Sequence, residues 1–530
     1  MKTLLEFATE DVLTSLLIKE RAKCRRRNRS DKHHTLSKDC DLLELSSRKM
    51  LSRIMPPRRL WVRPKKRKRL DNGAVDTSKN AEKALHLTIK RNRKRQKEGV
   101  AFGYLDELDA FIERIKKRLS SESLQFDKPL LLPIYKDKEK KDDRSFLVTC
   151  RPLSVYLKLE DKIVLALTSR YLTRYFDKYL HSNILSYRRA RDFNGKKHYV
   201  TDFNDGIQLI REFREAHDAE TIYASDCDIK KFYDIIPHQV VRDCFEKILG
   251  KSYLDEEGKR QVMRVLEAYL ASYNFYTNAW MEAQQHDRVF YKVRRKFHDK
   301  DKKNSYQFKW VDDIWEKPEE EYKKLGVPQG GALSLLIANI VLNDVDEVFT
   351  ANFDDNRMLF IRYCDDMILL HTDEKECRRL MEQYAESLKS HGLYYHDFKD
   401  VSNCTRSEFW KLKSHFPFCW EDGEGNRNRY IGFVGYEIRR DGRMRLRKSN
   451  IERFVEKFNR LWYSIRRYGK THTKEEFLAH QEQTLDKALD GVNFYKGFDL
   501  EVFKKGSQFR YLRKLKKRTK QRYPIKQKSE

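Results

Sequence analysis

The sequence lacks an apolar run long enough to cross a membrane. Its most apolar stretch, residues 332–342, is far shorter than the ~20 residues that a spanning helix needs. Glu6, Glu10 and Asp11 interrupt the leucines of the first 18 residues, which argues against a secretory signal. The nine cysteines are scattered without a C-x-x-C pair, which indicates reduced thiols and not a disulfide framework. These absences predict a cytoplasmic chain without a membrane partner.

Positive charge, in contrast, is abundant. The 530 residues include 111 Lys and Arg against 81 Asp and Glu, which gives a formal net charge of +30. A field of this size predicts a polyanionic partner, and nucleic acid is the first candidate. The length exceeds the ~250–300 residues at which a single core stops growing, so we expect several domains.

Much of the excess charge lies near the amino end. Residues 19–98 contain 28 Lys and Arg and 9 Asp and Glu, and the five consecutive basic residues are Lys65, Lys66, Arg67, Lys68 and Arg69. Pro56-Pro57 and Asp71-Asn72-Gly73 predict short helices and loops here and not a second large core. We interpret residues 1–125 as a basic, mainly helical extension that contacts a nucleic-acid backbone; a solvated tail is the alternative.

The hydrophobic pattern of the remaining chain predicts a mixed α+β fold. Apolar residues at helical spacing predict helices over residues 105–119 and 158–179, and two apolar runs around residues 130–150 predict a hairpin. Strands and helices then alternate to about residue 440, and the pattern from residue 451 onward is helical. Residues 274–324 interrupt the alternation as an insertion, in which aromatic side chains such as Trp280 either stack on template bases or pack a small subdomain.

Two strand ends carry clustered carboxylates. Asp226 and Asp228 end one apolar run, and the pair Asp365-Asp366 separates two others, as at the tip of a hairpin. Adjacent carboxylates repel one another unless a cation lies between them, and oxygen ligands suit Mg²⁺. Two such ions a few Å apart support an in-line phosphoryl transfer. Asp226 either tunes this metal site or is a solvated acid at the strand end.

A third element is a glycine-rich turn that runs into a helix over residues 326–339. Its glycines, Gly330 among them, allow close approach of the backbone to a ligand, and Gln329 supplies hydrogen-bond donors and acceptors. Each of the three elements is common when taken alone. Their order along the chain is what is specific.

In that order, Asp228-x4-Tyr233, Pro-Gln-Gly-Gly at 328–331 and Tyr-Cys-Asp-Asp at 363–366 resemble the reverse transcriptases of the bacterial, group II intron-related lineage. The resemblance covers about residues 130–500. It implies a right-hand polymerase with fingers and the start of the palm at 126–222, the palm at 223–440, and a helical thumb and basic tail at 441–530. The implied activity is RNA-directed DNA synthesis from deoxynucleoside triphosphates on an RNA template.

The resemblance also implies roles for individual residues. Asp228, Asp365 and Asp366, with the carbonyl of Ile229, would bind two Mg²⁺ ions, with Mn²⁺ as a substitute, and Lys399 would donate a proton to pyrophosphate. Tyr233 would exclude ribonucleotides, while Gln329 and Gly330 would pack along the nascent base pair. The remaining implied contacts are Lys136 and Arg151 to the triphosphate and Arg188, Gly435 and Tyr436 to nucleic acid.

Two positions depart from the intron-encoded pattern. Leu335 replaces a proline that commonly follows the serine of the glycine-rich motif, and Arg189 stands where a glycine-phenylalanine step is expected. With the basic extension, these departures make the chain resemble the "unknown group" bacterial reverse transcriptases of antiphage defence, which suggests a dedicated non-coding RNA. A mobile-element enzyme, a template-independent polymerase and an inactive nucleic-acid-binding scaffold remain alternatives. A homo-oligomer or a second protein subunit is also left open.

Overall fold

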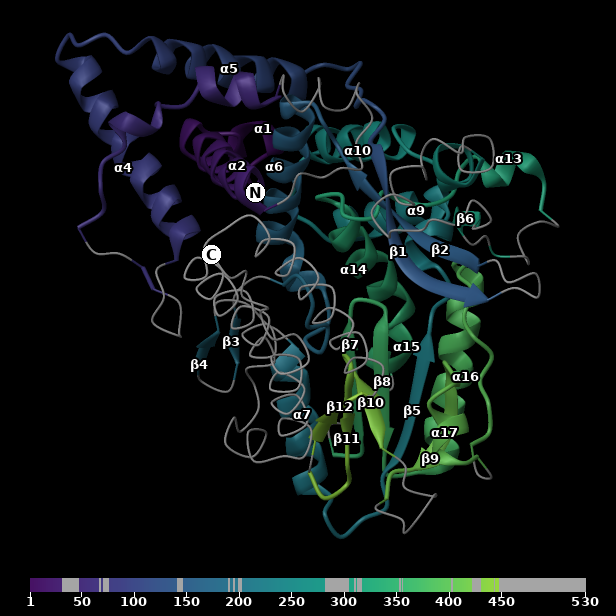
Figure 1. Ribbon diagram of the computed structural model, residues 1–530. Coiled ribbons are helices and arrows are strands. Elements are labelled where there is room, and N and C mark those ends of the chain that lie inside the picture. Colours follow the sequence, from purple (N-terminus) through teal and green to yellow (C-terminus); the bar gives the residue numbers. More distant parts are fainter. Residues whose placement is uncertain are drawn as a thin grey trace, which may run out of the picture. The chain divides into compact units, whose positions relative to one another are not determined.

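The computed structural model shows a mixed α and β chain that separates into two compact units (Figure 1). One unit comprises Met1–Arg189, Ile229–Ala351 and Gln383–Tyr395, and the other comprises Ala190–Asp228, Asn352–Glu382 and His396–Glu530. The structure describes residues 1–447 apart from 31–46, 66–67, 70–75, 141–145, 189–190, 194–195, 199–202, 282–304, 309–310, 312–316, 352–353, 355, 402–403, 422–429 and 443. The predicted thumb and basic tail therefore lie almost entirely outside the described residues.

The amino-terminal part of the first unit is built from packed helices. These are α1 (Leu4–Phe7), α2 (Glu10–Ser30), α4 (Thr77–Lys97) and α5 (Gly103–Leu119), of which α2 contacts α4 and α6 (Leu159–Phe176). The helices α2 and α4 have 21 residues each, longer than the short helices expected from the punctuation of the sequence. Leu13, Leu17 and Leu85 are buried, so the apolar positions that these basic helices do have fix them to a folded body.

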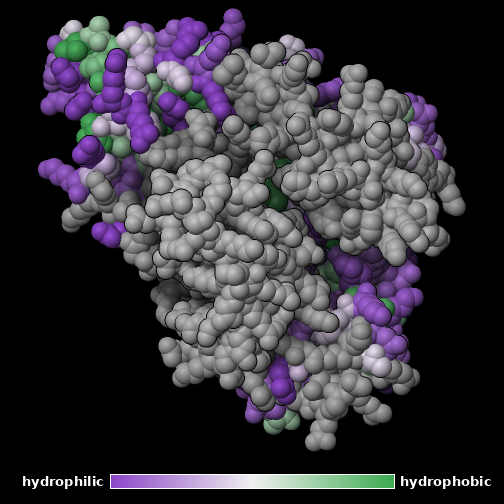
Figure 2. Space-filling view, viewed as in Figure 1, coloured by the Kyte–Doolittle hydropathy of each residue, from purple (hydrophilic) through white to green (hydrophobic). Residues whose placement is uncertain are grey.

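The surface of this region is strongly hydrophilic. Figure 2 shows mainly hydrophilic side chains over α4 and α5, with hydrophobic groups between them. Lys94, Arg95 and Lys97 lie in the last turn of α4, where the negative end of the helix dipole favours cations. The described part of the extension is therefore a folded helical surface and not a solvated tail.

Two helices that the sequence periodicity predicts are present in the structure. In α5 the residues predicted to form the apolar face are all buried, and the helix ends at Leu119 as expected. The predicted helix over 158–179 is α6 followed by the 3-10 helix η2 (Asp177–Tyr179). Further along, the unit contains α8 (Phe232–Ile235), α9 (His238–Gly250), α10 (Glu256–Ala271), η3 (Tyr276–Met281), α13 (Glu319–Tyr322), α14 (Ser334–Val345) and α15 (Glu347–Ala351), together with η1 (Arg58–Leu60).

The predicted hairpin near residue 140 is present and is longer than its apolar runs. β1 (Leu130–Lys140) pairs antiparallel with β2 (Phe146–Val155), and β6 (Ser305–Phe308) adds to β2 in parallel. β6 thus connects the segment predicted as an insertion to this sheet. In the same segment Trp280 stacks on Tyr276 with ring centroids 5.4 Å apart, and Tyr276 also contacts buried Tyr322. This arrangement corresponds to the alternative in which Trp280 packs a small subdomain.

The second unit is built on a four-stranded antiparallel sheet in the order β7-β8-β5-β9. Its strands are β5 (Tyr223–Asp228), β7 (Met358–Tyr363), β8 (Asp366–His371) and β9 (His415–Cys419). Helix α7 (Phe203–Ala216) packs on β7. The other elements are β3 (Arg191–Phe193), β4 (Lys196–His198), α17 (Arg406–Phe409) and the meander β10 (Ile431–Phe433), β11 (Tyr436–Ile438) and β12 (Met444–Leu446), while α16 (Glu374–Ser390) begins in this unit.

No helix among the described residues has the length and apolar character that a membrane span requires. The most apolar stretch of the sequence is instead α14, where nine of twelve side chains are buried. A helix that is apolar on nearly all sides is explained by burial within a protein core.

Candidate active site

The three predicted catalytic carboxylates lie at one end of the four-stranded sheet. Asp228 is the last residue of β5 and Asp366 the first of β8, and the antiparallel register pairs them directly. Side chains that face each other in such a pair have Cβ atoms about 4.5–5.5 Å apart. Asp365 belongs to the two-residue loop between β7 and β8, which Tyr363 and Asp366 close as a pair. The sequence motif therefore forms a hairpin tip next to the end of β5.

The hairpin turn is held by an arginine inside the sheet. Cys364 has a φ of 59°, a left-handed conformation that is uncommon for a residue with a side chain. Arg362 is fully buried, and its Nη1 donates a hydrogen bond of 2.9 Å to the Cys364 carbonyl oxygen. Such an internal bond offsets the strain of the turn. Sequence reasoning missed this role, although a charged residue within an apolar strand was a usable signal.

Asp366 occupies an electrostatically unusual position. Burial raises the pKa of its carboxyl to about 7, and the charges of Asp365 and Asp226 act in the same direction. Arg447 and a 2.8 Å hydrogen bond from the Val434 backbone N–H to Oδ2 favour the charged form. Half-buried carboxylates that repel one another and offer only oxygen atoms fit a hard divalent cation, which would relieve the repulsion.

A lysine and a histidine lie close to Asp228. The Nζ of Lys413 lies 3.3 Å from its Oδ2, and the Nε2 of His396 lies 3.8 Å from the same atom. The backbone N–H of Asp228 donates to Ser414 Oγ at 3.0 Å, while its carbonyl accepts from the His396 N–H at 3.0 Å. Lys413 and His396 were absent from the sequence prediction, because neither belongs to a motif with Asp228. Only the fold brings them close to it.

Asp226 is not the solvated acid that one interpretation allowed. Its Oδ1 accepts hydrogen bonds from His415 Nδ1 at 2.6 Å and from the His415 backbone N–H at 3.2 Å. Burial of the imidazole opposes its charge, but Asp226 prevails and the pKa of His415 is raised. The pair connects β5 to β9 and fixes the strand that carries Asp228.

The glycine-rich turn lies in the other unit, where several contacts fix it. Gln329 Nε2 donates to Asp234 Oδ1 at 2.5 Å, and its carbonyl accepts from the Ser154 N–H at 2.7 Å. Gly330 has a φ of 83°. This left-handed conformation favours glycine, whereas a Cβ here would meet only the end of the exposed Leu153 side chain, at 2.6 Å from Cδ1.

Tyr233 belongs to the same arrangement. It lies in α8, half-buried, with its ring edge-on to Phe232 at 5.3 Å between centroids. Its carbonyl accepts a 2.8 Å hydrogen bond from the Val327 N–H. The structure thus joins two segments predicted to bind substrate, although they are distant in the sequence.

The remaining predicted triphosphate and metal contacts have simple placements. Arg151 is exposed on β2, and Lys136 lies in β1, where its side chain is outside the described set. Ile229 forms an isolated bridge with Tyr395. The structure does not test the ligand roles implied for these residues.

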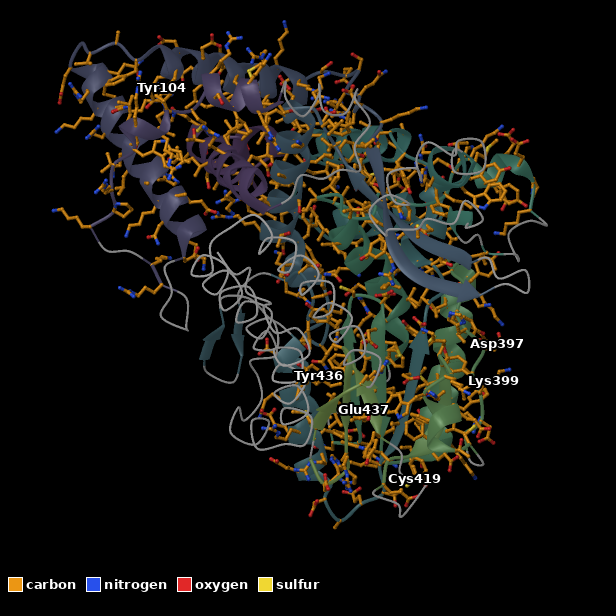
Figure 3. The ribbon with its side chains drawn as sticks, viewed as in Figure 1. Tyr104, Asp397, Lys399, Cys419, Tyr436 and Glu437 are labelled. Atoms are coloured by element: carbon orange, nitrogen blue, oxygen red, sulfur yellow. The ribbon has the colours of Figure 1, made fainter. Side chains whose placement is uncertain are left out.

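Lys399 lies beyond the edge strand β9. It forms a bridge with His415 and is exposed. Figure 3 shows Lys399 beside Asp397, away from Tyr436 and Glu437. Lys399 follows three residues after His396, which contacts Asp228, but its own backbone pairs with β9. Its proton-donor role stays a prediction.

Arg188 requires a correction. It was predicted to contact nucleic acid, but it is 4% exposed and its guanidinium is used internally. Nε donates to Asp177 Oδ1 at 2.7 Å, and the other nitrogens donate to backbone carbonyls of residues 177–184. A buried arginine with these bonds is a structural residue that holds the loop of the neighbouring Tyr187, which is 50% exposed with a φ of 52°.

Tyr436 also requires a correction. Its side chain is 1% exposed within β11, so it cannot contact nucleic acid as predicted. The turn before it has positive φ at both Val434 (42°) and Gly435 (88°), as a type I′ hairpin requires. The Val434 N–H of this turn binds Asp366, so the turn backbone, and not the tyrosine ring, reaches the carboxylates.

One segment of this chain matches a known protein family. Residues 274–437 match the model of the family described as "Reverse transcriptase (RNA-dependent DNA polymerase)". The match includes the glycine-rich turn, the hairpin with Asp365 and Asp366, and the β10–β11 turn, and it begins where the predicted insertion begins. No curated protein matches the chain.

Among solved structures, the chain resembles yeast telomerases. Apo telomerase from Candida tropicalis is 15% identical with a TM-score of 0.35, covering 76% of this chain and 58% of that one. Telomerase from Candida albicans with a TWJ fragment of telomeric RNA is 12% identical with a TM-score of 0.31, covering 74% and 65%. The matched region thus spans less than two thirds of either telomerase chain.

Proposed function

We propose that the chain is an RNA-directed DNA polymerase and that Asp228, Asp365 and Asp366 are its catalytic carboxylates; the match of residues 274–437 to the reverse transcriptase family supports this activity. The proposed reaction joins deoxynucleotides on an RNA template by phosphoryl transfer with two metal ions. The observation that carries this proposal is the register that pairs Asp228 with Asp366 beside the loop that bears Asp365. A chance pair of acids in a turn would have no third carboxylate directly across the sheet.

The three carboxylates would hold the divalent cations, Mg²⁺ or Mn²⁺, because they supply only oxygen ligands from one sheet end. When bound, the ions activate the attacking hydroxyl and neutralise charge on the leaving pyrophosphate. The protein's own part is to orient the ligands. The Val434 N–H fixes Oδ2 of Asp366, Arg362 fixes the turn that bears Asp365, and Ser414 fixes the backbone of Asp228.

Roles in substrate binding are proposed for four further residues. Tyr233 and Gln329 would border the incoming nucleotide, and their segments are joined by the hydrogen bond between the Tyr233 carbonyl and Val327. Lys136 and Arg151 on the β1–β2 hairpin would bind the triphosphate. These assignments rest on the motif resemblance, and the packing of the two segments supports them.

We further propose that the template is a dedicated non-coding RNA and that the enzyme acts in antiphage defence in the bacterial cytoplasm. The basic helical extension and the departures at Arg189 and Leu335 support this choice over a mobile-element enzyme. Sequencing the nucleic acids that copurify with the chain tests it. A recurrent small RNA and DNA complementary to it are expected, whereas intron RNA would contradict the proposal.

The catalytic assignment is tested by replacing both acids of the hairpin with their amides. Asp365→Asn with Asp366→Asn retains side-chain size but removes the charges, and we expect loss of labelled deoxynucleotide incorporation on a primed RNA by at least ~10³-fold. Asp397→Asn is the control, because Asp397 is an exposed acid of the same unit. Removing divalent ions with EDTA should abolish synthesis, and excess Mg²⁺ should restore it.

RNA binding separates a catalytic defect from misfolding. Retained RNA in a filter-binding assay, with no incorporation, is the expected result for the doubly substituted chain. Undiminished synthesis by that chain would refute the assignment of the metal ligands. Full activity in EDTA would refute metal-dependent transfer itself.

A further inference from the structure

A second set of potential metal ligands lies in the helical part of the first unit, which contains none of the three catalytic carboxylates. Cys244 of α9, Asp344 of α14 and His391, directly after α16, each offer a ligand atom. These sulfur, oxygen and nitrogen atoms all lie within 4.8 Å of one another. In a tetrahedral zinc site, bond lengths of about 2.0–2.3 Å place ligand atoms roughly 3.3–3.8 Å apart, so a contraction of about 1 Å completes the geometry.

The backbone holds His391 firmly at the end of α16. Gly392 has a φ of 64°, its N–H donates to the Lys389 carbonyl at 2.9 Å, and the Leu393 N–H donates to the Leu388 carbonyl at 2.9 Å. These two bonds form a Schellman motif, which fixes the helix end. His391 is therefore presented to α9 and α14 by a defined backbone and not by a free loop.

The imidazole of His391 has the orientation of a metal ligand. Its Nδ1 lies 2.6 Å from the Ser387 carbonyl oxygen, which can only accept, so Nδ1 carries a hydrogen. Nε2 lies 3.1 Å from Asp344 Oδ2. Metal-binding histidines almost always donate their second ring N–H to a carbonyl or carboxylate in this way. The Asp344 carboxylate raises the pKa of His391 and so favours a proton on Nε2; a metal ion at this point would take the place of that proton.

Asp344 is prepared in the same manner. Its Oδ1 accepts a hydrogen bond from Lys247 Nζ, which also binds Glu347 Oε2 at 2.7 Å, so only Oδ2 is directed to His391. Carboxylate ligands of metals are likewise held by a hydrogen bond at the other oxygen.

Cys244 completes the set with a donor that Mg²⁺ does not favour. Cys244 is 5% exposed, and burial raises the pKa of its thiol. A thiolate, an imidazole and a carboxylate together are a zinc-type donor set. The side chains of His391 and Asp344 are 16% and 21% exposed, which leaves a route for an ion and for a water as the fourth ligand.

We propose that Cys244, Asp344 and His391 bind a Zn²⁺ ion that fastens the end of α16 to α9 and α14. This site differs from the proposed catalytic centre in both ligand chemistry and place in the chain. An ion pair of protonated His391 with Asp344 is the competing interpretation, and it requires neither the thiol nor a metal.

The test uses the purified full-length chain, stripped of metal and titrated with Co²⁺ in excess Mg²⁺, which occupies the oxygen-only site. We expect one bound Co²⁺ per chain with a thiolate-to-cobalt charge-transfer band, displaced by Zn²⁺. Cys244→Ala should abolish the band and weaken Co²⁺ binding on the order of 100-fold or more. Cys377→Ala is the matched control, because Cys377 is also buried but lies outside the cluster.

His391→Gln tests the same site without altering a buried cysteine, so the proposal remains testable if Cys244→Ala fails to fold. The expected result is again loss of the band, together with loss of the rise in melting temperature that Zn²⁺ gives the unsubstituted chain. Absence of a thiolate band in the unsubstituted chain would overturn the proposal in favour of the ion pair. Retention of the band in Cys244→Ala, or its loss in Cys377→Ala, would overturn it as well.

Discussion

Among single residues, Tyr233 has the most direct predicted consequence for function. It is half-buried against Phe232, and its carbonyl bond to Val327 ties it to the glycine-rich segment. A ring held in this way has little freedom to move aside for a 2′-hydroxyl. Tyr233→Ala should therefore raise the ratio of ribonucleotide to deoxynucleotide incorporation, by roughly 10- to 100-fold, since a lost steric contact is worth about 1–3 kcal/mol.

Competition between labelled nucleotides of the two sugars on one primed RNA measures that ratio. Tyr233→Phe is the control, because it keeps the ring and removes only the hydroxyl, and its sugar preference should equal that of the unsubstituted chain. If Tyr233→Ala retained the original preference while still extending primers, another side chain would guard the 2′ position.

At this scale the sequence predicts which residue types matter but not which way they point. The three carboxylates follow from motif order, whereas Arg188 and Tyr436 were assigned to nucleic acid and are buried. An arginine or a tyrosine can contact a ligand at the surface or can be buried within the protein. Which of the two occurs depends on the carbonyl groups and strands that the fold places around the side chain. Arg362 was missed for the same reason, since its partner is a backbone oxygen.

At the scale of elements, local periodicity predicted well what neighbouring residues determine. Helices α5 and α6 and the β1–β2 hairpin follow from apolar spacing within each segment. The pairing of β5 with β8, which places Asp228 opposite Asp366, involves strands more than a hundred residues apart and has no local signal. The parallel pairing of the four-residue β6 with β2 is likewise determined by the fold alone.

The turn before α14 gives a prediction about packing. A Cβ at Gly331 would lie 2.1 Å from the hydroxyl oxygen of Tyr269, which is fully buried and hydrogen-bonded to Ser334 Oγ at 2.8 Å. Gly331→Ala should therefore destabilise the unit by about 1–3 kcal/mol, the usual cost of overpacking. Chemical denaturation of the purified chain measures this change.

A second substitution identifies the cause. Tyr269→Phe removes the clashing oxygen, so the double variant should be more stable than the two single effects predict, with a coupling of about 1 kcal/mol or more. Gly103→Ala is the control, because a Cβ there meets nothing within 4 Å and it should be nearly neutral. Additive effects of Gly331→Ala and Tyr269→Phe would show that the hydroxyl is not the obstacle.

For the molecule as a whole, the question is whether the charge of +30 acts globally or through one local surface. The basic run at residues 65–69 offers a test, since Lys65, Lys68 and Arg69 are exposed. The backbone of Lys68 is anchored to α4, with its N–H donating to Asn80 Oδ1 at 2.9 Å and its carbonyl accepting from Asn80 Nδ2 at 2.8 Å. A charge cluster on an anchored segment can follow an RNA backbone in one orientation.

Replacing all five residues of the run with Gln should lower RNA affinity and flatten its dependence on salt. Each lost phosphate contact reduces the slope of log affinity against log salt by roughly 0.7 for single strands, or up to about 3.5 for five contacts.

The matched control neutralises the same number of exposed basic residues scattered over the same unit, namely Lys178, Lys251, Arg260, Lys323 and Lys324. Both variants lose the same net charge, so a purely global field predicts equal loss of affinity and slope. A larger loss for the run places the RNA backbone on the amino-terminal extension, whereas equal losses would show that this run has no special role in binding.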